Sequence, residues 1–195
     1  MKNIYKLFIV TLLVGTAISC SESDLIIDEV LDNVDSESGA VVRTVEAPAD
    51  LVTLTGENNL ITFTIEVQQG NGSFQPDFKE VRALVSLYQD QDLIEPTVDA
   101  DGNALGELLF ETFDASQFSI GSNGLPRISA EIPTQNIVDV FPENTDYTVP
   151  TFISLRLELE MTDGRVFTNV NLGASVTGGT YWAASFLYRI IFLPN

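Results

Sequence analysis

The residues whose types and spacing best suit chemistry are Asp99, Asp101 and Asn103, whose side-chain oxygens recur at alternating positions. Calcium takes about six to eight oxygen ligands, so these three residues, with Glu107 further on, form a weak candidate calcium site. The stretch departs from an EF-hand loop, because Ala104 stands where that loop requires glycine. The alternative is an Asp-Gly turn inside a hairpin. The sequence favours the turn, and we expect no metal or other cofactor.

A second candidate site is the pair Tyr181 and Trp182, which follows two consecutive glycines. Aromatic faces on a flexible loop can stack on the apolar C–H surface of a sugar ring, so the pair is a possible ligand-binding site. The alternative is that Trp182 fills the end of the protein core, as large aromatic side chains usually do. The sequence favours this second interpretation.

Catalytic chemistry has little support. The chain has no histidine, which removes the commonest general base and the commonest zinc ligand. It has no Gly-x-Ser-x-Gly elbow and no phosphate-binding loop. A glycosidase needs two carboxyl groups at a defined separation, about 5 Å in the retaining class, and no pattern brings such a pair together. We expect a protein that is not an enzyme, with a carboxylate-based hydrolase as the weakest alternative.

The only cysteine, Cys20, ends an apolar run that begins at Leu7 and follows two lysines. A basic start, a short apolar core and small residues at the end are typical of a secretory signal. The run is shorter than the roughly 20 residues of a membrane-spanning helix. Its end, Ala17-Ile18-Ser19-Cys20, resembles the lipobox of bacterial lipoproteins, which implies a signal peptide over 1–19 and a lipidated, palmitate-bearing Cys20. The alternative is a chance cysteine near an ordinary cleavage site.

The residues after Cys20 turn abruptly acidic. They resemble the surface-export signals of Bacteroidota lipoproteins, and the four residues concerned are Ser21, Glu22, Ser23 and Asp24. Residues 20–38 contain no basic residue, so self-repulsion should extend them into an acidic linker. The resemblance implies a lipid-anchored protein of the outer membrane that faces the cell exterior. The linker would hold the following domain clear of the membrane.

Net charge limits the possible partners. The chain carries 9 basic and 28 acidic residues, a formal charge of −19. Both lysines of the signal peptide leave with it, so the formal charge of the remaining chain is −21. Such a balance opposes binding to nucleic acid, whose phosphates require lysine and arginine. It also opposes adhesion to anionic lipid headgroups, so membrane contact is expected through the N-terminal lipid alone.

From residue 39 to residue 195 the sequence predicts one all-β domain. Strict alternation of apolar and polar residues marks half-buried strands over 60–67, 81–88 and 152–161. Shorter strands are expected over 40–45, 108–113, 126–132 and 165–168, a helical turn over 133–140, and a central final strand over 185–193. Short strands separated by turn signals are typical of an antiparallel β-sandwich, here of about seven to nine strands. It is immunoglobulin-like in architecture only, because the cysteine and tryptophan spacing of antibody domains is absent.

The order of these features resembles small immunoglobulin-like surface lipoproteins of the Bacteroidota that accompany SusC/SusD-type uptake systems. The resemblance rests on the lipobox, the acidic linker, residues 39–44, residues 162–167 and an aromatic final strand. It implies an accessory or ligand-binding role in glycan or nutrient uptake, with an outer-membrane uptake complex or a glycan as partner. It supplies no catalytic residue. The alternative is a structural or adhesive surface domain that binds another protein.

Overall fold

A computed structural model describes residues 39–70, 76–147, 150–172 and 186–194. These residues belong to one compact unit, Ser38–Asn195. In this part of the chain no helix has the length and apolar character needed to cross a membrane.

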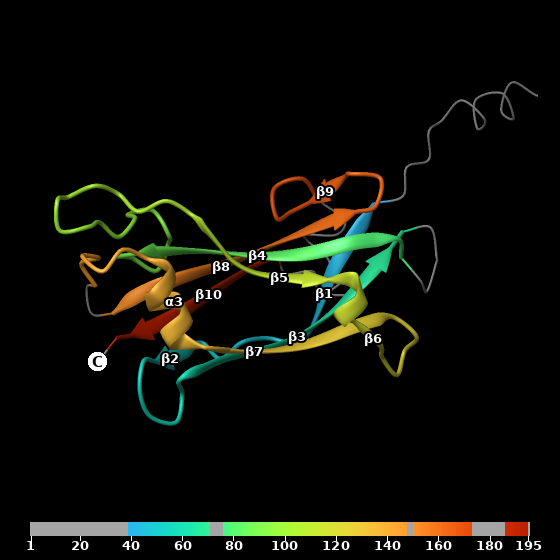
Figure 1. Ribbon diagram of the computed structural model, residues 1–195, viewed down its shortest axis with the longest axis horizontal. Helices are drawn as coiled ribbons and strands as arrows, with labels where there is room; N and C mark the ends of the chain where they lie inside the picture. Colours follow the sequence, from blue (N-terminus) through green and yellow to red (C-terminus); the bar gives the residue numbers. More distant parts are fainter. Residues whose placement is uncertain (1–38, 71–75, 148–149, 173–185, 195) are drawn as a thin grey trace, which may run out of the picture. The chain divides into compact units, whose positions relative to one another are not determined.

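The described strands form two sheets (Figure 1). Sheet A contains, in spatial order, β1 (Ala40–Glu46), β3 (Leu60–Gln69), β7 (Pro126–Pro133) and β6 (Ser119–Ile120). Sheet B contains β2 (Leu51–Thr53), β10 (Leu187–Leu193), β8 (Thr151–Met161), β4 (Phe78–Tyr88) and β5 (Leu108–Asp114), and β9 (Val166–Phe167) pairs with β8. A short 3-10 helix η1 (Ala115–Gln117) and one helix, α3 (Thr134–Val140), complete the described elements.

The strand order is that of an immunoglobulin-like sandwich. Sheet A follows the order A-B-E-D, and β10-β8-β4-β5 follows the order G-F-C-C′ of a variable-type domain. The first strand is divided between the sheets, because β1 pairs with β3 whereas β2 pairs in parallel with β10. All other strand pairs in the described ranges are antiparallel. The predicted all-β sandwich is therefore confirmed.

The predicted elements match the structure closely. The helical turn is present as α3, and β10 lies between β2 and β8, so it is not an edge strand. An Asp163-Gly164 turn joins β8 to β9: Gly164 has a φ of 87°, and Asp163 Oδ1 accepts from the backbone N–H of Arg165 at 3.0 Å. The described part contains ten strands rather than seven to nine. The prediction omitted β2 and β6, which have three and two residues and are too short to show alternation.

Alternating side chains of the two sheets fill the core. β8 and β4 are neighbouring strands of sheet B, and their inward residues lie side by side in register. The pairs Leu157–Ala83 and Leu159–Val81 are examples, and all four residues are fully buried. On sheet A, Phe63 packs edge-on against Phe113 with 6.1 Å between ring centroids. Since the described residues contain no cysteine, apolar packing takes the place of the disulfide found in antibody domains.

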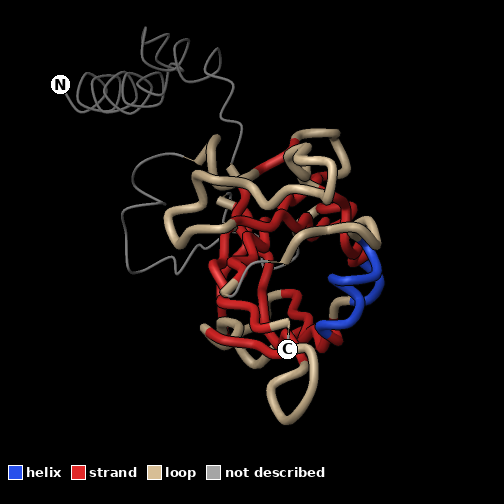
Figure 2. The backbone as a smooth tube through the Cα atoms, turned by 90° about the vertical axis from the view of Figure 1, so that its left-hand side faces the viewer, coloured by secondary structure: helices blue, strands red, loops and turns tan. Residues whose placement is uncertain are grey.

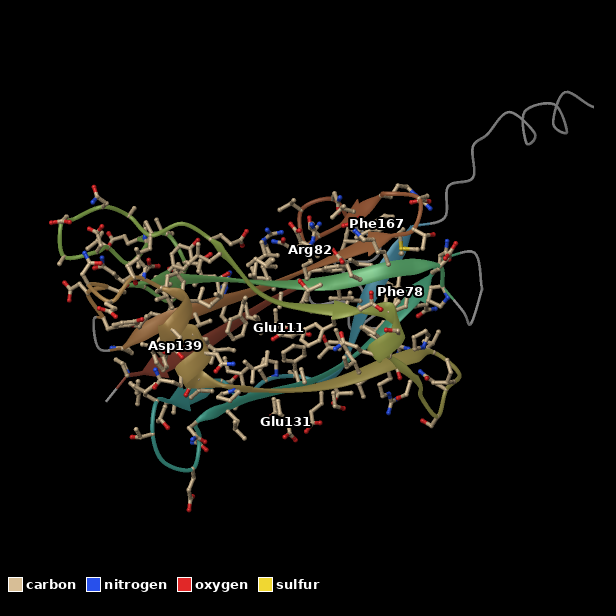
Figure 3. The ribbon with its side chains drawn as sticks, viewed as in Figure 1. Phe78, Arg82, Glu111, Glu131, Asp139 and Phe167 are labelled. Carbon is tan, nitrogen blue, oxygen red and sulfur yellow. The ribbon has the colours of Figure 1, made fainter. Side chains whose placement is uncertain are left out.

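Strand β5 is one of the two edge strands of sheet B in the described part, and it carries an inward-facing charge. Pairing of Glu111 with the buried Ala83 places the Glu111 side chain on the core side of the sheet. A β-bulge separates this pair from the next one, in which Leu109 of β5 pairs with Leu84 of β4. The Leu109 side chain is 56% exposed. Figure 3 shows Glu111 between β5 and β7, at the open edge of the sandwich.

Candidate binding pocket at the far end of the sandwich

The strand registers define two ends of the sandwich. The near end is where the described chain begins, and there the backbone N–H of Gly70 donates to the carbonyl of Gly39 at 2.7 Å. The far end is where β4 finishes and β8 begins, with Tyr88 paired to Phe152. It carries the β4–β5 connection, α3 and the chain that follows α3, on the left in Figure 1. Figure 2 views the molecule from this end.

The first part of the β4–β5 connection is organised by Asp90. Its carboxylate accepts hydrogen bonds from the backbone N–H groups of Asp92, Ile94 and Glu95 at 2.8, 3.0 and 2.6 Å. These bonds favour the charged form and hold the pKa of Asp90 below its usual value, with the Glu95 bond contributing most. They also hold the turn in which Leu93 has a positive φ of 59°, a conformation that leucine rarely adopts.

The second part of this connection packs on the chain that follows α3. The backbone N–H of Ala100 donates to the carbonyl of Asn144 at 2.8 Å, and that of Asp146 donates to the carbonyl of Val98 at 3.0 Å. The Thr145 hydroxyl donates to the carbonyl of Pro142 at 2.6 Å. These backbone bonds join two segments that are more than 40 residues apart in the sequence and fix their relative position.

A pocket of about 420 Å³ lies between the two segments. Its walls come from residues 104–108 on one side and from the end of α3 on the other, and they consist of Ala104, Leu105, Gly106, Leu108, Val140, Phe141 and Pro142. This volume lies within the usual range for ligand pockets, about 300–1,000 Å³. The lining side chains are apolar, and the ring of Phe141 is only 4% exposed. The exposed Leu109 is the next residue in the chain after Leu108 of the pocket wall.

The two segments that form the pocket carry only negative charge. Between residues 98 and 107, and again between 138 and 147, there is no lysine or arginine, whereas six acidic residues occur: Asp99, Asp101, Glu107, Asp139, Glu143 and Asp146. Only Glu107 is paired to a cation in the described structure, to Arg156 of β8. These two segments therefore carry five carboxylates that lack a cationic partner among the described residues.

The candidate calcium residues form a hydrogen-bonded turn at this end. Asp99 accepts from the backbone N–H of Asp101 at 2.9 Å, and from the backbone and side-chain N–H groups of Asn103 at 2.8 and 3.0 Å. The Asn103 side chain is the main cause of the lowered pKa of Asp99. Gly102 has the positive φ, 84°, that an Asp-Gly turn needs. Among the described residues there is no group of three or more acidic, histidine or cysteine side chains able to hold a metal ion.

A second charged cluster surrounds Glu66 on the outer face of sheet A. Glu66 is 1% exposed, and it accepts from Arg127 Nε at 2.8 Å, from Asn123 Nδ2 at 2.7 Å and from Arg43 Nη1 at 3.3 Å. At Gly121 a Cβ atom would lie 2.9 Å from Arg127 Nε, so glycine permits the β6–β7 loop to close over this cluster. Both carboxylate oxygens of Glu66 accept hydrogen bonds from these donors, so the cluster holds β1, β3 and β7 to the β6–β7 loop.

The outer face of sheet B carries a ladder of ion pairs. Arg82 lies 3.1 Å from Glu158 and 3.5 Å from Glu160, and Lys79 donates to Glu160 at 2.9 Å. Arg156 donates to Glu158 at 2.8 Å. The bond from Lys79 is the main cause of the lowered pKa of Glu160. A general acid requires a raised carboxyl pKa, whereas every shifted carboxyl pKa in the described residues is lowered.

The remaining predicted site residues lie outside the described residues. They are the lipidation residue Cys20, the export residues Ser21, Glu22, Ser23 and Asp24, and the aromatic pair Tyr181 and Trp182. Their roles stay predictions. The pocket itself was not predicted, since its walls are about 35 residues apart and share no local pattern. The run of acidic residues in the β4–β5 connection was the only signal in that region.

The strand order thus defines an immunoglobulin-like β-sandwich with a pocket at its far end. The chain matches no family model and no curated protein. Among solved structures, murine CRIg aligns with 80% of this chain and 98% of its own chain, at 8% identity and a TM-score of 0.32.

Proposed function

We propose that this chain is a lipid-anchored, non-catalytic binding protein that faces the exterior of the outer membrane and serves as an accessory to a nutrient or glycan uptake system. The observation that carries the binding role is the placement of the pocket. The domain begins at the near end, at Gly39, and the pocket opens at the far end, between Leu108 and Val140. Loops on a rigid scaffold commonly carry binding residues, and the pocket is built from two such connections at the end opposite Gly39.

The charged clusters support a role without catalysis. The buried carboxylate of Glu66 is saturated by donors from two arginines and an asparagine. The carboxylates of sheet B are neutralised by Lys79, Arg82 and Arg156. Acidic side chains held in this way stay ionised and paired, which suits structural support better than proton transfer.

A structural or adhesive domain that binds another protein is the second candidate, and one surface favours it. At the far end of sheet B the outward residues Tyr88, Phe152, Ile191 and Leu51 are aligned in register across four neighbouring strands. All four are partly exposed. Apolar rows of this kind on an outer sheet face are typical of protein contacts. A SusC/SusD gene pair beside this gene would favour the uptake role, and its absence would favour adhesion.

Anchoring is tested by replacing Cys20 with alanine. The variant should leave the membrane fraction and appear in the soluble fraction, because burial of each lipid CH₂ contributes about 0.8 kcal/mol and stable anchoring needs more than one chain. Fractionation followed by immunoblotting measures this. Ser23→Ala, which keeps the cysteine, is the control and should stay with the membrane. Retention of the Cys20→Ala protein in the outer membrane would contradict lipid anchoring.

Surface display is tested by replacing Glu22 and Asp24 with alanine. The double variant should keep its lipid but become protected from protease added to intact cells, since the acidic residues after the cysteine would direct export. Replacement of Asp28 and Glu29, which removes the same charge further along the linker, is the matched control and should remain cleavable. Equal cleavage of both double variants would show that Glu22 and Asp24 carry no export signal.

A further inference from the structure

The chemistry of the far-end pocket identifies the group that it can accept. Leu105, Leu108 and Val140 are only half-buried, and Ala104 and Pro142 are exposed, so the wall side chains that reach solvent are aliphatic. A volume of about 420 Å³ accommodates a large apolar side chain together with neighbouring backbone. A neutral glycan is a poor match, because sugar rings prefer exposed aromatic faces and the ring of Phe141 is buried.

The charge of the two pocket segments indicates which residues should flank the apolar group of a ligand. The five carboxylates without a cationic partner lie in the two chain segments that supply the walls, and neither segment contains a lysine or arginine. Hydrogen bonds from Asn103 lower the pKa of Asp99 and so favour its charged form. Like charges gathered on two neighbouring segments raise the local concentration of cations and repel anionic surfaces. Charge complementarity therefore favours a ligand with positive charge on both sides of an apolar centre.

We propose that this pocket docks a basic segment of a partner protein, in which a large aliphatic side chain enters the pocket and flanking lysine or arginine residues face the surrounding carboxylates. The proposal rests on the binding role given above and names the class of partner. All seven basic residues after residue 38 lie outside the two pocket segments. These segments therefore carry no positive charge that would repel an incoming cation.

The test uses the full chain in detergent and three synthetic peptides, Lys-Lys-Leu-Lys-Lys, Lys-Lys-Ser-Lys-Lys and Glu-Glu-Leu-Glu-Glu, in calorimetric titrations. The lysine–leucine peptide should bind saturably. The serine peptide should bind at least about tenfold more weakly, which corresponds to about 1.4 kcal/mol. The glutamate peptide should not bind. Raising the sodium chloride concentration from about 0.05 M to about 0.5 M should weaken the lysine–leucine complex, because the carboxylates are exposed.

Two variants examine the pocket and its charge separately. Gly106→Phe adds a ring at an exposed wall position where a Cβ meets no atom within 4 Å, and it should weaken binding about tenfold without unfolding the protein. Asp139→Asn combined with Glu143→Gln should weaken binding about three- to tenfold at low salt. Glu131→Gln, an exposed acidic residue on β7, is the charge control and should bind as the unaltered protein does. Thermal melts confirm that each variant is folded.

Several results would overturn the proposal. They are a folded protein that binds none of the peptides, equal affinity for the leucine and serine peptides, unchanged binding by Gly106→Phe, or an equal loss for Glu131→Gln. Binding of a neutral oligosaccharide in place of the peptides would assign the pocket to glycans instead. None of these titrations depends on anchoring through Cys20, so a failed pocket and a failed membrane assignment give separate results.

Discussion

Replacing Glu66 with alanine is expected to lower the free energy of unfolding by about 3 kcal/mol. Removing one partner of a buried ion pair costs about 3–5 kcal/mol, since the remaining charge loses its partner. We expect a loss at the low end of this range, because the side chains of Arg43 and Arg127 are 29% and 30% exposed and can be partly hydrated in the variant. Asn123 would lose its acceptor as well. Urea unfolding followed by tryptophan fluorescence or circular dichroism measures the difference.

The control for this variant is Glu131→Ala on the neighbouring strand β7. Glu131 is exposed on the outer side of the same sheet, as Figure 3 shows, and its replacement should change stability by no more than about 0.5 kcal/mol. Glu66→Gln should fall between the two, because it keeps the shape of the side chain but removes the charge. Equal stability of Glu66→Ala and Glu131→Ala would mean that the Glu66 cluster does not hold sheet A to its loop.

Replacing Leu157 with alanine is expected to cost about 2–5 kcal/mol of stability. Leu157 is fully buried in the middle of β8, where it pairs with the equally buried Ala83 of β4. Because Ala83 is small, the neighbouring strand offers little side chain to fill the cavity, which favours the upper half of that range. Thermal and urea unfolding of the purified protein measure the loss.

Leu109→Ala supplies a control with the same chemical change. Leu109 lies on β5 and is 56% exposed, so its truncation should cost less than about 0.5 kcal/mol. If the two leucine variants lost similar amounts of stability, β8 would not be the centre of the core. If Leu157→Ala remained as stable as the unaltered protein, the two-sheet arrangement itself would be wrong.

Strand positions were predictable where alternation was long. Over β3, β4 and β8 the apolar period of two residues marks which side chains point inward, as for Phe63, Val85 and Leu155, and all three are buried. The short strands β2 and β6 have too few residues to express a period. They form because neighbouring strands offer free backbone groups, a property of the assembled sheets rather than of any local stretch.

The charged and binding features could not be predicted in the same way. Glu66 occupies a polar position of an alternating strand and would be expected on an exposed face. Its burial comes from Arg43 and Arg127, which are 23 and 61 residues away in the sequence. The pocket likewise depends on backbone hydrogen bonds between distant connections, such as that from Ala100 to Asn144. Such contacts leave no local pattern.

The inward-facing Glu111 of β5 bears on how copies of this protein behave when crowded. An outer strand presents unpaired backbone groups that can add a strand from another molecule, which is a common start of aggregation. A strand docking along β5 would cover the edge where Glu111 lies and strip water from its carboxylate, at a substantial cost in free energy. The bulge beside it further disrupts a continuous ladder. Molecules packed at high density would therefore stay separate along this edge, and self-association would have to use another surface.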